Sequence, residues 1–376
     1  MKNLWLLSFC TVLISCTAVR QIKDQEIVHK KQCESFDLSD GAIVLKTTID
    51  GKKHDLLVDT GATLTIINDT TVITDLYKKE VGSLGTVVGS DRKNAVARRS
   101  VTVDFETTLF ESKNKVVTLI SKPQSKCGSS SIKGIIGTDC FFGQEDPLFL
   151  NFTDGKICLI DQAQMQSRLE NKGYREVKST CSLGKVYIYL TVAGTEHKFT
   201  FDTGYTGQIV MPYDEKLNWD NYNRMELDGS AFATAISQTQ GTETYFEKVP
   251  VLIAGHKLNA KPILSGTIKS QVVGIQFLKG FDWIIDYSNN KVYAKRNHLK
   301  IEDLFLQRVQ YQVTAKDKLL VTLKERKQTR YNLGDEIVSV NGQKVTPENN
   351  CEWQAFLNKT EDWSAIDLQV SPVVKP

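Results

Sequence analysis

Two identical Asp-Thr-Gly triplets are the residues of this chain best suited to chemistry. Asp59 opens the first triplet and Asp202 opens the second, 143 residues later. Two carboxyl groups held a few ångströms apart cannot both ionise readily, so such a pair shares one proton. The charged member can take a proton from water while the protonated member gives one to a carbonyl oxygen. Because such a pair titrates as a unit, the sequence assigns neither role to a particular aspartate.

The triplets lie at equivalent places in an internal repeat. Residues 41–67 align without a gap to residues 184–210, with nine identities in 27 positions, where average composition would give about two. In each copy a β-forming run, a turn at Gly51 or Gly194 and a second apolar run lead into the triplet. This pattern predicts a β-hairpin with the aspartate at the end of its second strand.

The repeat continues downstream of each triplet. The stretch Gly134 to Phe141 parallels Val272 to Leu278, and Phe149 to Cys158 parallels Ile284 to Tyr293. The second pair of stretches predicts hairpins with Asp-Gly or Asn-Asn turns. The duplication therefore predicts two lobes, both mainly β.

These motifs carry a family resemblance. Asp-Thr-Gly-Ala-Thr at 59–63, followed by Ile-Ile-Gly-Thr-Asp at 135–139, resembles the retropepsin-type aspartic proteases. It is most similar to the bacterial aspartyl-protease family that pairs such lobes with a PDZ domain, and the resemblance spans about 34–297. It implies two acid-protease β-barrel lobes in one chain and an aspartic endopeptidase that acts on polypeptide. Since this chain carries both triplets, a monomer is sufficient for the site.

The resemblance also implies roles for single residues. Asp59 and Asp202 match the catalytic pair. The hydroxyls of Thr60 and Thr203 match positions that cross-bond beneath the aspartates. The remaining matches are glycines: two that let a backbone N–H approach each carboxylate and two that pack under the active loops, namely Gly61, Gly204, Gly137 and Gly274.

Two departures from the family pattern keep a second hypothesis open. Tyr205 stands where the first copy has Ala62 and where the family prefers a small residue, and Gln276 stands where the first copy has Asp139. Catalysis in such a site also needs a flap that excludes water, for which the best stretches are 82–97 and 228–241. The alternative to an active enzyme is a catalytically inactive, peptide-binding lipoprotein with protease-like lobes.

The last eighty residues follow a different pattern. Leu333-Gly334-Asp335 and the later Asn341-Gly342 resemble the signature of PDZ domains, and Asn-Gly after an apolar strand predicts a hairpin turn. A short helix at 352–358 and a closing strand at 365–370 complete a small α+β domain. PDZ domains bind a peptide carboxy terminus by strand addition. Since the usual carboxylate-binding loop is not visible here, a purely structural domain remains the alternative.

The first residues predict export. Lys2 precedes an apolar stretch that is too short to span a bilayer. It ends in Leu-Ile-Ser-Cys at 13–16, which resembles the lipobox of bacterial lipoproteins and implies cleavage before Cys16 and lipid attachment to its thiol. An ordinary secretory signal cut near Ala18 is the alternative. The expected product is a membrane-anchored lipoprotein that faces the periplasm or otherwise lies in the cell envelope. The full expected order is 1–16 signal peptide, 17–33 tether, 34–162 lobe one, 163–297 lobe two and 298–376 PDZ-like domain.

The composition and the net charge limit the classes of partner and cofactor that this chain is expected to bind. A net charge of +3, from 47 basic and 44 acidic residues, gives no electrostatic case for nucleic acid. Neither a C-x-x-C nor an H-E-x-x-H motif occurs, so we expect no metal site and no cofactor. Six cysteines remain once Cys10 is removed and Cys16 is acylated, and an exported chain could pair them in any of 15 ways.

Overall fold

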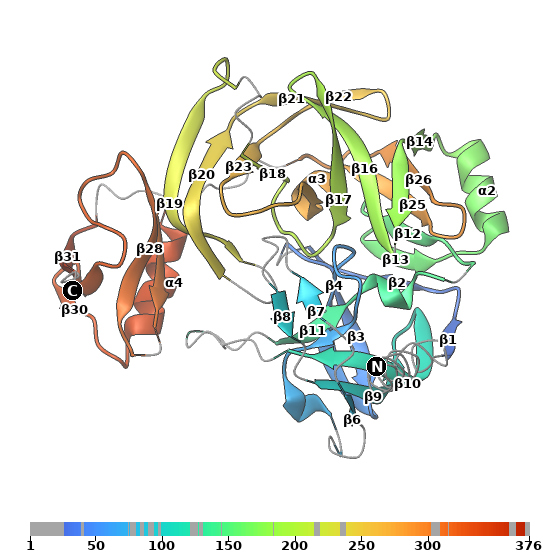
Figure 1. Ribbon diagram of the computed structural model, residues 1–376, viewed down its shortest axis with the longest axis horizontal. Helices are drawn as coiled ribbons and strands as arrows, with labels where there is room; N and C mark the ends of the chain where they lie inside the picture. The colour runs from blue at the N-terminus through green and yellow to red at the C-terminus, as the bar shows by residue number, and fades with distance from the viewer. Residues whose placement is uncertain are drawn as a thin grey trace, which may run out of the picture.

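The computed structural model describes residues 26–38, 41–73, 75, 80–82, 86–88, 94–96, 99–120, 127, 131–143, 145–182, 184–213, 219–233, 238–301, 309–314, 316–360 and 366–372. The fold is mainly β, with two barrel-type lobes followed by a small α+β domain (Figure 1). This confirms the fold class expected from the duplication. Cys16 lies outside the described residues.

Lobe one is built on an eight-stranded sheet whose order is β1-β10-β5-β11-β4-β3-β9-β6. A further pairing of β9 with β10 closes the sheet into a barrel. A separate two-stranded sheet pairs β7 with β8. The strands are β1 Glu26–His29, β3 Val44–Ile49, β4 Lys52–Val58, β5 Ile66–Ile67, β6 Glu80–Gly82, β7 Thr86–Val88, β8 Asn94–Val96, β9 Arg99–Glu106, β10 Phe110–Leu119 and β11 Ile132–Ile136.

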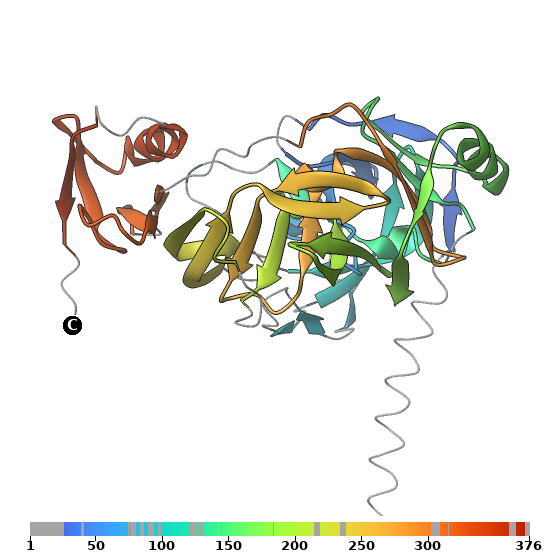
Figure 2. The ribbon, with the colours of Figure 1, turned by 90° about the horizontal axis from the view of Figure 1, so that it is seen from above.

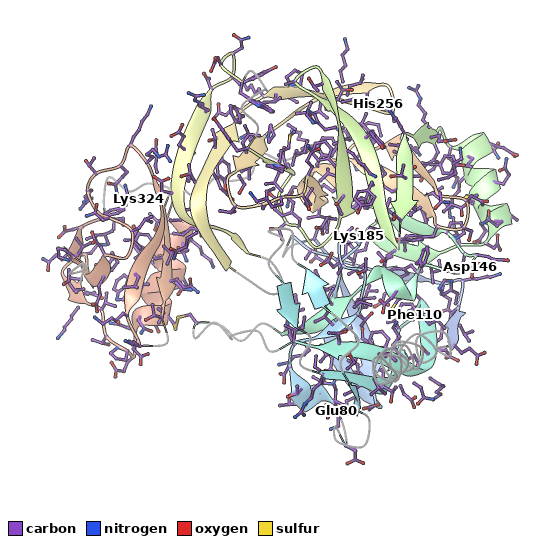
Figure 3. The ribbon with its side chains drawn as sticks, in the orientation of Figure 1. Glu80, Phe110, Asp146, Lys185, His256 and Lys324 are labelled. Carbon is purple, nitrogen blue, oxygen red and sulfur yellow. A yellow bond between two sulfur atoms is a disulfide. The ribbon has the colours of Figure 1, made fainter. Side chains whose placement is uncertain are left out.

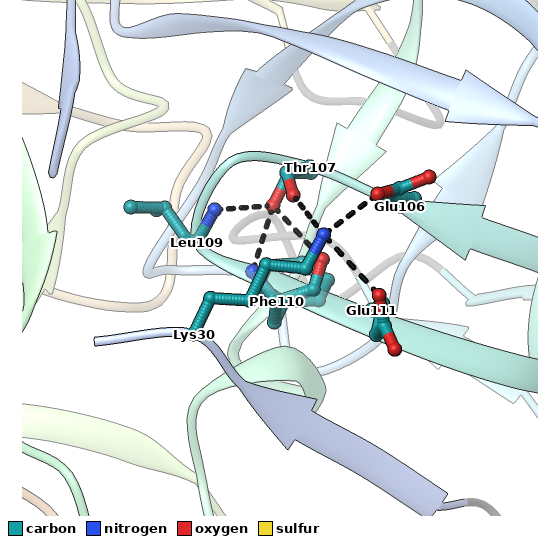
Figure 4. A network of polar contacts seen from close by, with 6 residues as sticks. All are labelled: Lys30, Glu106, Thr107, Leu109, Phe110 and Glu111. Atoms are coloured by element: carbon teal, nitrogen blue, oxygen red, sulfur yellow. Dashed lines mark hydrogen bonds and ion pairs between the residues drawn. The ribbon is translucent and has the colours of Figure 1, made fainter. Parts of the chain in front are cut away.

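The segment expected to be a tether at 17–33 contributes a strand to lobe one. Strand β1 pairs antiparallel with β10, from Glu26 opposite Lys113 to His29 opposite Phe110. Just after β1, the Lys30 ammonium lies 2.7 Å from Glu106 Oε1 and 3.3 Å from Glu111 Oε2, at the turn between β9 and β10 (Figure 4). The expected boundary between the tether and lobe one, at residue 33, therefore lies too far along the chain, because lobe one already includes Glu26. Backbone pairing with β10 and the Lys30 ion pairs hold this segment in place. Because the segment has no long apolar run, the sequence pattern did not reveal it as a strand.

A six-stranded sheet joins the two lobes. Its order is β14-β26-β25-β12-β13-β2, and β12 of the first repeat pairs directly with β25 of the second, Leu148 opposite Ile285. The hairpins expected in both repeats are present, as β12–β13 and β25–β26. The strands are β2 Cys33–Ser35, β12 Leu148–Asn151, β13 Lys156–Leu159, β14 Arg175–Val177, β25 Phe281–Asp286 and β26 Lys291–Arg296.

Lobe two lies in a fifteen-stranded sheet that continues into the C-terminal domain. The path runs β22-β21-β16-β17-β24-β18-β23-β20-β19-β28-β29-β30, and β15, β27 and β31 branch from it. The lobe-two strands are β15 Ser179–Ser182, β16 Lys185–Val192, β17 Thr195–Asp202, β18 Ile209–Pro212, β19 Arg224–Ala233, β20 Gln238–Phe246, β21 Val249–Ile253, β22 His256–Ala260, β23 Pro262–Ser265 and β24 Val272–Gly274.

The C-terminal domain lies at one end of the molecule and has its own hydrophobic core (Figure 2). Strand β28 pairs with β19 of lobe two, and the Arg326 guanidinium binds the carboxylate of Asp228 through Nε at 3.1 Å and Nη2 at 2.9 Å. The elements are β27 Val309–Val313, β28 Leu319–Glu325, β29 Glu336–Val340, β30 Gln343–Lys344, α4 Asn350–Lys359 and β31 Leu368–Ser371. The expected helix and closing strand are thus present, with bounds shifted by one to three residues.

Two disulfides fasten these parts. Cys33–Cys158 joins β2 to β13, and Cys127–Cys351 joins the segment at Cys127 to α4 of the C-terminal domain. Of the cysteines the structure describes, Cys140 and Cys181 are unpaired.

No helix in the described part of the chain is long and apolar enough to cross a membrane. The remaining short helices are η1 Thr70–Val72, η3 Thr138–Cys140, α2 Gln162–Asn171 and α3 Ile275–Leu278.

Candidate active site

Two equivalent hairpins carry the aspartates. In β3–β4 the turn residues Asp50 and Gly51 have φ of 49° and 81°, and in β16–β17 Ala193 and Gly194 have φ of 50° and 86°. Two successive positive φ angles match the twist of the adjoining strands, and glycine at the second position adopts them without strain. Strand β4 then ends at Val58, directly before Asp59, and β17 ends at Asp202, as the repeat predicts.

The two loops are cross-bonded beneath the aspartates. The Thr60 hydroxyl donates to the Phe201 carbonyl at 2.8 Å and accepts the Thr203 N–H at 3.0 Å. The Thr203 hydroxyl in turn donates to the Val58 carbonyl at 2.7 Å and accepts the Thr60 N–H at 3.1 Å. Both threonines have no exposed surface. These four buried hydrogen bonds place the two loops in register with each other.

Each carboxyl group lies against the glycine of the opposite loop. A Cβ on Gly61 would be 2.4 Å from Asp202 Oδ2, and a Cβ on Gly204 would be 2.4 Å from Asp59 Cγ. Within its own loop, Asp59 Oδ1 accepts the N–H groups of Gly61 at 2.8 Å and Ala62 at 3.0 Å. Asp202 Oδ1 accepts the equivalent N–H groups, from Gly204 at 2.9 Å and Tyr205 at 3.0 Å. The structure therefore brings Asp59 and Asp202 together, with two backbone donors fixing each carboxyl.

Burial raises the pKa of both carboxyl groups. For Asp202 the neighbouring Asp59 charge and a hydrogen bond to Asp59 raise the pKa further, well above the usual range. For Asp59 the increase is opposed by the hydrogen bond from Asp202, by the Ala62 and Gly61 N–H groups and by the Lys185 charge. The two carboxyl groups therefore do not ionise together readily, and the pair holds one proton between them.

A stability measurement tests whether the pair retains a buried proton near neutral pH. The Asp202 pKa is higher in the folded than in the unfolded chain, so unfolding becomes more favourable as pH rises from the unfolded value towards the folded one. We expect Asp202→Asn to raise the free energy of unfolding near pH 7, where the parent has to keep a buried proton. This gain should disappear below about pH 3, where the carboxyl is protonated in both states. Chemical denaturation of the two proteins at both pH values checks it, and an equal difference at both would contradict it.

The support beneath the two loops differs between the lobes. In lobe one the Thr65 hydroxyl donates to Asp139 Oδ1 at 2.8 Å, and the buried Lys115 ammonium lies 2.6 Å from Asp139 Oδ2. In lobe two the residue equivalent to Thr65 is Gln208, whose side-chain oxygen accepts the Lys261 N–H at 2.8 Å. Gln276 therefore replaces one member of a supporting ion pair, and the pair of Asp59 and Asp202 itself keeps both carboxyl groups.

Tyr205 is accommodated by two glycines. A Cβ on Gly207 would be 2.3 Å from the Tyr205 hydroxyl oxygen, and a Cβ on Gly274 would be 2.5 Å from Tyr205 Cδ1. The ring packs with the lobe-two cluster of Val210, Ile263, Ile268, Val272 and Tyr245. The ring therefore occupies space inside lobe two, while its main-chain N–H still binds Asp202 as Ala62 N–H binds Asp59.

Two charged residues lie near the pair of Asp59 and Asp202 (the dyad), and no sequence pattern pointed to either of them. Lys185 begins β16 at the junction of the two lobes, where the first copy has Ala42 (Figure 3). Glu243 on β20 is almost fully buried beside Tyr245, whose hydroxyl lies 3.1 Å from Glu243 Oε2, and burial raises the Glu243 pKa. Neither residue is shared by the two copies, so the repeat could not reveal them.

Burial raises the pKa of the unpaired Cys140 thiol to about 12, which makes this thiol unsuited to act as a nucleophile.

Comparisons with known proteins add little to this geometry. No protein-family model matches the chain, and no curated protein matches it. Among solved structures, the chain is similar to the crystal structure of basic 7S globulin from soybean, with 9% sequence identity and a TM-score of 0.41. That similarity covers 75% of this chain and 99% of the globulin chain.

The class of the site rests on the molecule's own geometry. Two β-barrel lobes each end a strand in Asp-Thr-Gly, the threonines cross-bond, and the carboxyl groups meet over the opposing glycines. Two lobes of one chain therefore each supply one aspartate to a single paired site.

Proposed function

We propose that this chain is an aspartic endopeptidase that hydrolyses peptide bonds with a water activated between Asp59 and Asp202. The observation that carries the proposal is the convergence of the two carboxyl groups from duplicated loops, each fixed by two backbone N–H groups. A pair of this kind supplies a base and an acid at one place without a metal or a nucleophilic side chain.

The proposed reaction takes Asp59 as the ionised member of the pair and Asp202 as the protonated one. Ionised Asp59 takes a proton from the water as its oxygen attacks the peptide carbonyl carbon. Asp202 gives its proton to the carbonyl oxygen, which produces a neutral tetrahedral diol. Asp59 then gives its proton to the amide nitrogen while Asp202 takes a proton back from one diol hydroxyl. The C–N bond breaks, the amine and the carboxylic acid leave, and the pair returns to its starting state. Activity needs one protonated and one ionised member, so we propose an optimum on the acidic side.

The proposed setting is the cell envelope. We propose that the chain is exported and anchored in the membrane by a lipid on Cys16, facing the periplasm. Two disulfides support an oxidising compartment, since disulfides persist outside the reducing cytosol. The C-terminal domain is proposed to bind extended peptide, in keeping with its PDZ-like signature.

Cleavage of a mixed peptide library by the purified protein tests the proposal. We expect cleavage that is strongest at acidic pH and falls as the medium becomes neutral, measured by mass spectrometry from about pH 3 to about pH 8. Retained cleavage at full rate well above neutral pH would contradict the shared-proton mechanism. The absence of any cleavage by a well-folded protein would contradict the enzyme itself.

The alternative is an inactive, peptide-binding lipoprotein. The sequence raises this alternative through Tyr205 and Gln276, the two positions at which lobe two departs from the family pattern. It predicts peptide affinity without turnover at any pH, and that affinity would survive the change of either aspartate to asparagine.

A further inference from the structure

A third carboxyl group is buried in lobe two, on the strand that carries Tyr245. Glu243 lies on β20 and is 1% exposed. Strand β20 pairs there with β23, so Glu243 lies opposite Ser265 (Figure 1). The Tyr245 hydroxyl donates to Glu243 Oε2 at 3.1 Å, whereas Oε1 has no hydrogen-bond partner among the described residues. The fold therefore buries this carboxyl group and leaves one of its oxygens without a donor.

Tyr205 connects this carboxyl group to Asp202. Its main-chain N–H donates to Asp202 Oδ1 at 3.0 Å, and its ring packs in the lobe-two cluster with Tyr245, which binds Glu243. Burial raises the pKa of the Tyr205 phenol, and the charges of Glu243 and Asp202 raise it further. Both carboxyl groups therefore act on one ring.

The Tyr205 ring has no spare room in which to move alone. A Cβ on Gly207 would lie 2.3 Å from its hydroxyl oxygen, and a Cβ on Gly274 would lie 2.5 Å from both its Cδ1 and its carbonyl oxygen. In an interior packed this closely, a side chain shifts only together with its neighbours. A change in the lobe-two cluster therefore reaches the main chain at Tyr205, and through it the Asp202 carboxyl.

The surroundings of Glu243 favour its neutral form. A buried carboxylate without a cation or a full set of donors is disfavoured, so such a group keeps its proton or its site opens to water. Burial accordingly raises the pKa of Glu243, and the hydroxyls of Tyr245 and Ser265 oppose this rise only in part. The groups that face it are Tyr245 on its own strand, Ser265 on β23 and Tyr205 in the Asp202 loop. None of these groups is a cation.

The dyad holds its proton more tightly than Glu243 does. Burial, the charge of Asp59 and a hydrogen bond to Asp59 raise the pKa of Asp202 well above the usual range, whereas burial alone raises that of Glu243. As pH rises, Glu243 therefore loses its proton before the dyad loses the shared one. The first copy has Ala62 in place of Tyr205, so Asp59 has no comparable ring beside its loop.

We propose that Glu243 is a positioning residue for Asp202, that it acts through Tyr205, and that it does so only while it carries its proton. When that proton is lost, water enters the lobe-two cluster to solvate the carboxylate, and the Tyr205 ring shifts. The N–H that holds Asp202 Oδ1 shifts with it. The upper pH limit of cleavage is therefore set by Glu243 and not by the dyad. This inference rests on the proposed function, since it concerns the pH range in which the endopeptidase works.

The pH profile of kcat/KM tests this role. Glu243→Gln keeps the size of the side chain and an acceptor for the Tyr245 hydroxyl, but it cannot ionise. We expect the upper limb of its profile to lie about one pH unit or more above that of the parent, measured with one peptide identified from the library. Tyr245→Phe removes a donor that favours the carboxylate, so it should shift the same limb upward by a smaller amount, even if Glu243→Gln folds poorly.

Glu247→Gln is the matched control, since it removes an exposed carboxyl group just after β20 and should give the parent's profile. An upper limb at the parent's pH in both Glu243→Gln and Tyr245→Phe would overturn the proposal, because the dyad alone would then set the limit. An equal shift in Glu247→Gln would overturn it as well, because any carboxyl group of this region would then have the same effect.

Unfolding measurements report on Glu243 without cleavage. Its pKa is higher in the folded than in the unfolded chain, so the stability it contributes at low pH is lost as pH rises through the folded value. Glu243→Gln should therefore raise the free energy of unfolding more at about pH 7 than at about pH 3. Both proteins carry Asp202→Asn, so that the dyad proton does not contribute. A parent that cleaves no peptide would contradict the proposed function, whereas an equal difference at both pH values would overturn the buried proton on Glu243.

Discussion

Replacing Asp59 or Asp202 by asparagine lowers kcat/KM for peptide cleavage by about a thousandfold, which is the expected result if the two carboxyl groups form the catalytic pair. Asparagine keeps the shape and the acceptor for the loop N–H groups, but it neither takes a proton from water nor shares one. General acid–base groups typically contribute about 10²- to 10⁴-fold. Steady-state cleavage of one peptide identified from the library, followed at the parent's optimal pH, measures the effect.

The control is Asp50→Asn, in the turn of the same hairpin as Asp59. Asp50 has φ of 49°, a conformation that asparagine adopts as readily as aspartate, so the fold should be unaffected. This variant should cleave at the parent's rate. A dyad variant that kept more than about a tenth of the parent's activity would exclude the general acid–base mechanism.

Gly204→Ala is expected to lower kcat/KM by about a hundredfold while leaving most of the stability intact. The new Cβ would lie 2.4 Å from Asp59 Cγ and 2.6 Å from Asp59 Oδ2, distances at which something must move. Displacing a catalytic group by about 1 Å is enough for a loss of this size. Circular dichroism and thermal unfolding, run beside the kinetics, distinguish a displaced carboxyl from an unfolded lobe.

Gly266→Ala is the matched control for that change. A Cβ there would meet only the Thr242 carbonyl oxygen at 3.5 Å, an ordinary van der Waals contact, and Gly266 has no positive φ. If both glycine variants kept the parent's activity, close packing of the Asp59 carboxyl on Gly204 would not be needed for cleavage, and this prediction would be wrong.

Local patterns predicted the hairpins and their turns well. The repeat placed Asp59 and Asp202 at equivalent strand ends, because each copy encodes the same kind of turn and a first hairpin strand whose buried residues alternate. Asn341 and Gly342 take φ of 49° and 77°, as an Asn-Gly turn between strands requires. Predictions of this kind succeed because the interactions that decide them lie within a few residues.

Other features depend on residues that sequence spacing does not connect. Tyr205 suggested crowding of the dyad, yet the ring packs where Gly207 and Gly274 leave room, and only the fold brings those glycines beneath it. The pairing of Cys127 with Cys351 spans 224 residues and was one possibility among many. The pairing of β19 with β28 could not be predicted from the sequence either, since its hydrogen bonds are made by backbone groups that every residue carries.

The shared six-stranded sheet has a consequence for how the chain assembles. Strand β12 finds its partner β25 only when residues near 285 are available, since Leu148 lies opposite Ile285 and Phe149 opposite Ile284. A chain made from its N-terminus therefore cannot complete this sheet until most of the second copy has been synthesised. Contacts between residues so distant in sequence slow folding and expose unpaired edges in the interval. The duplication that created two similar lobes has thus left neither able to finish folding alone, and the dyad forms late, once both halves of the chain are in place.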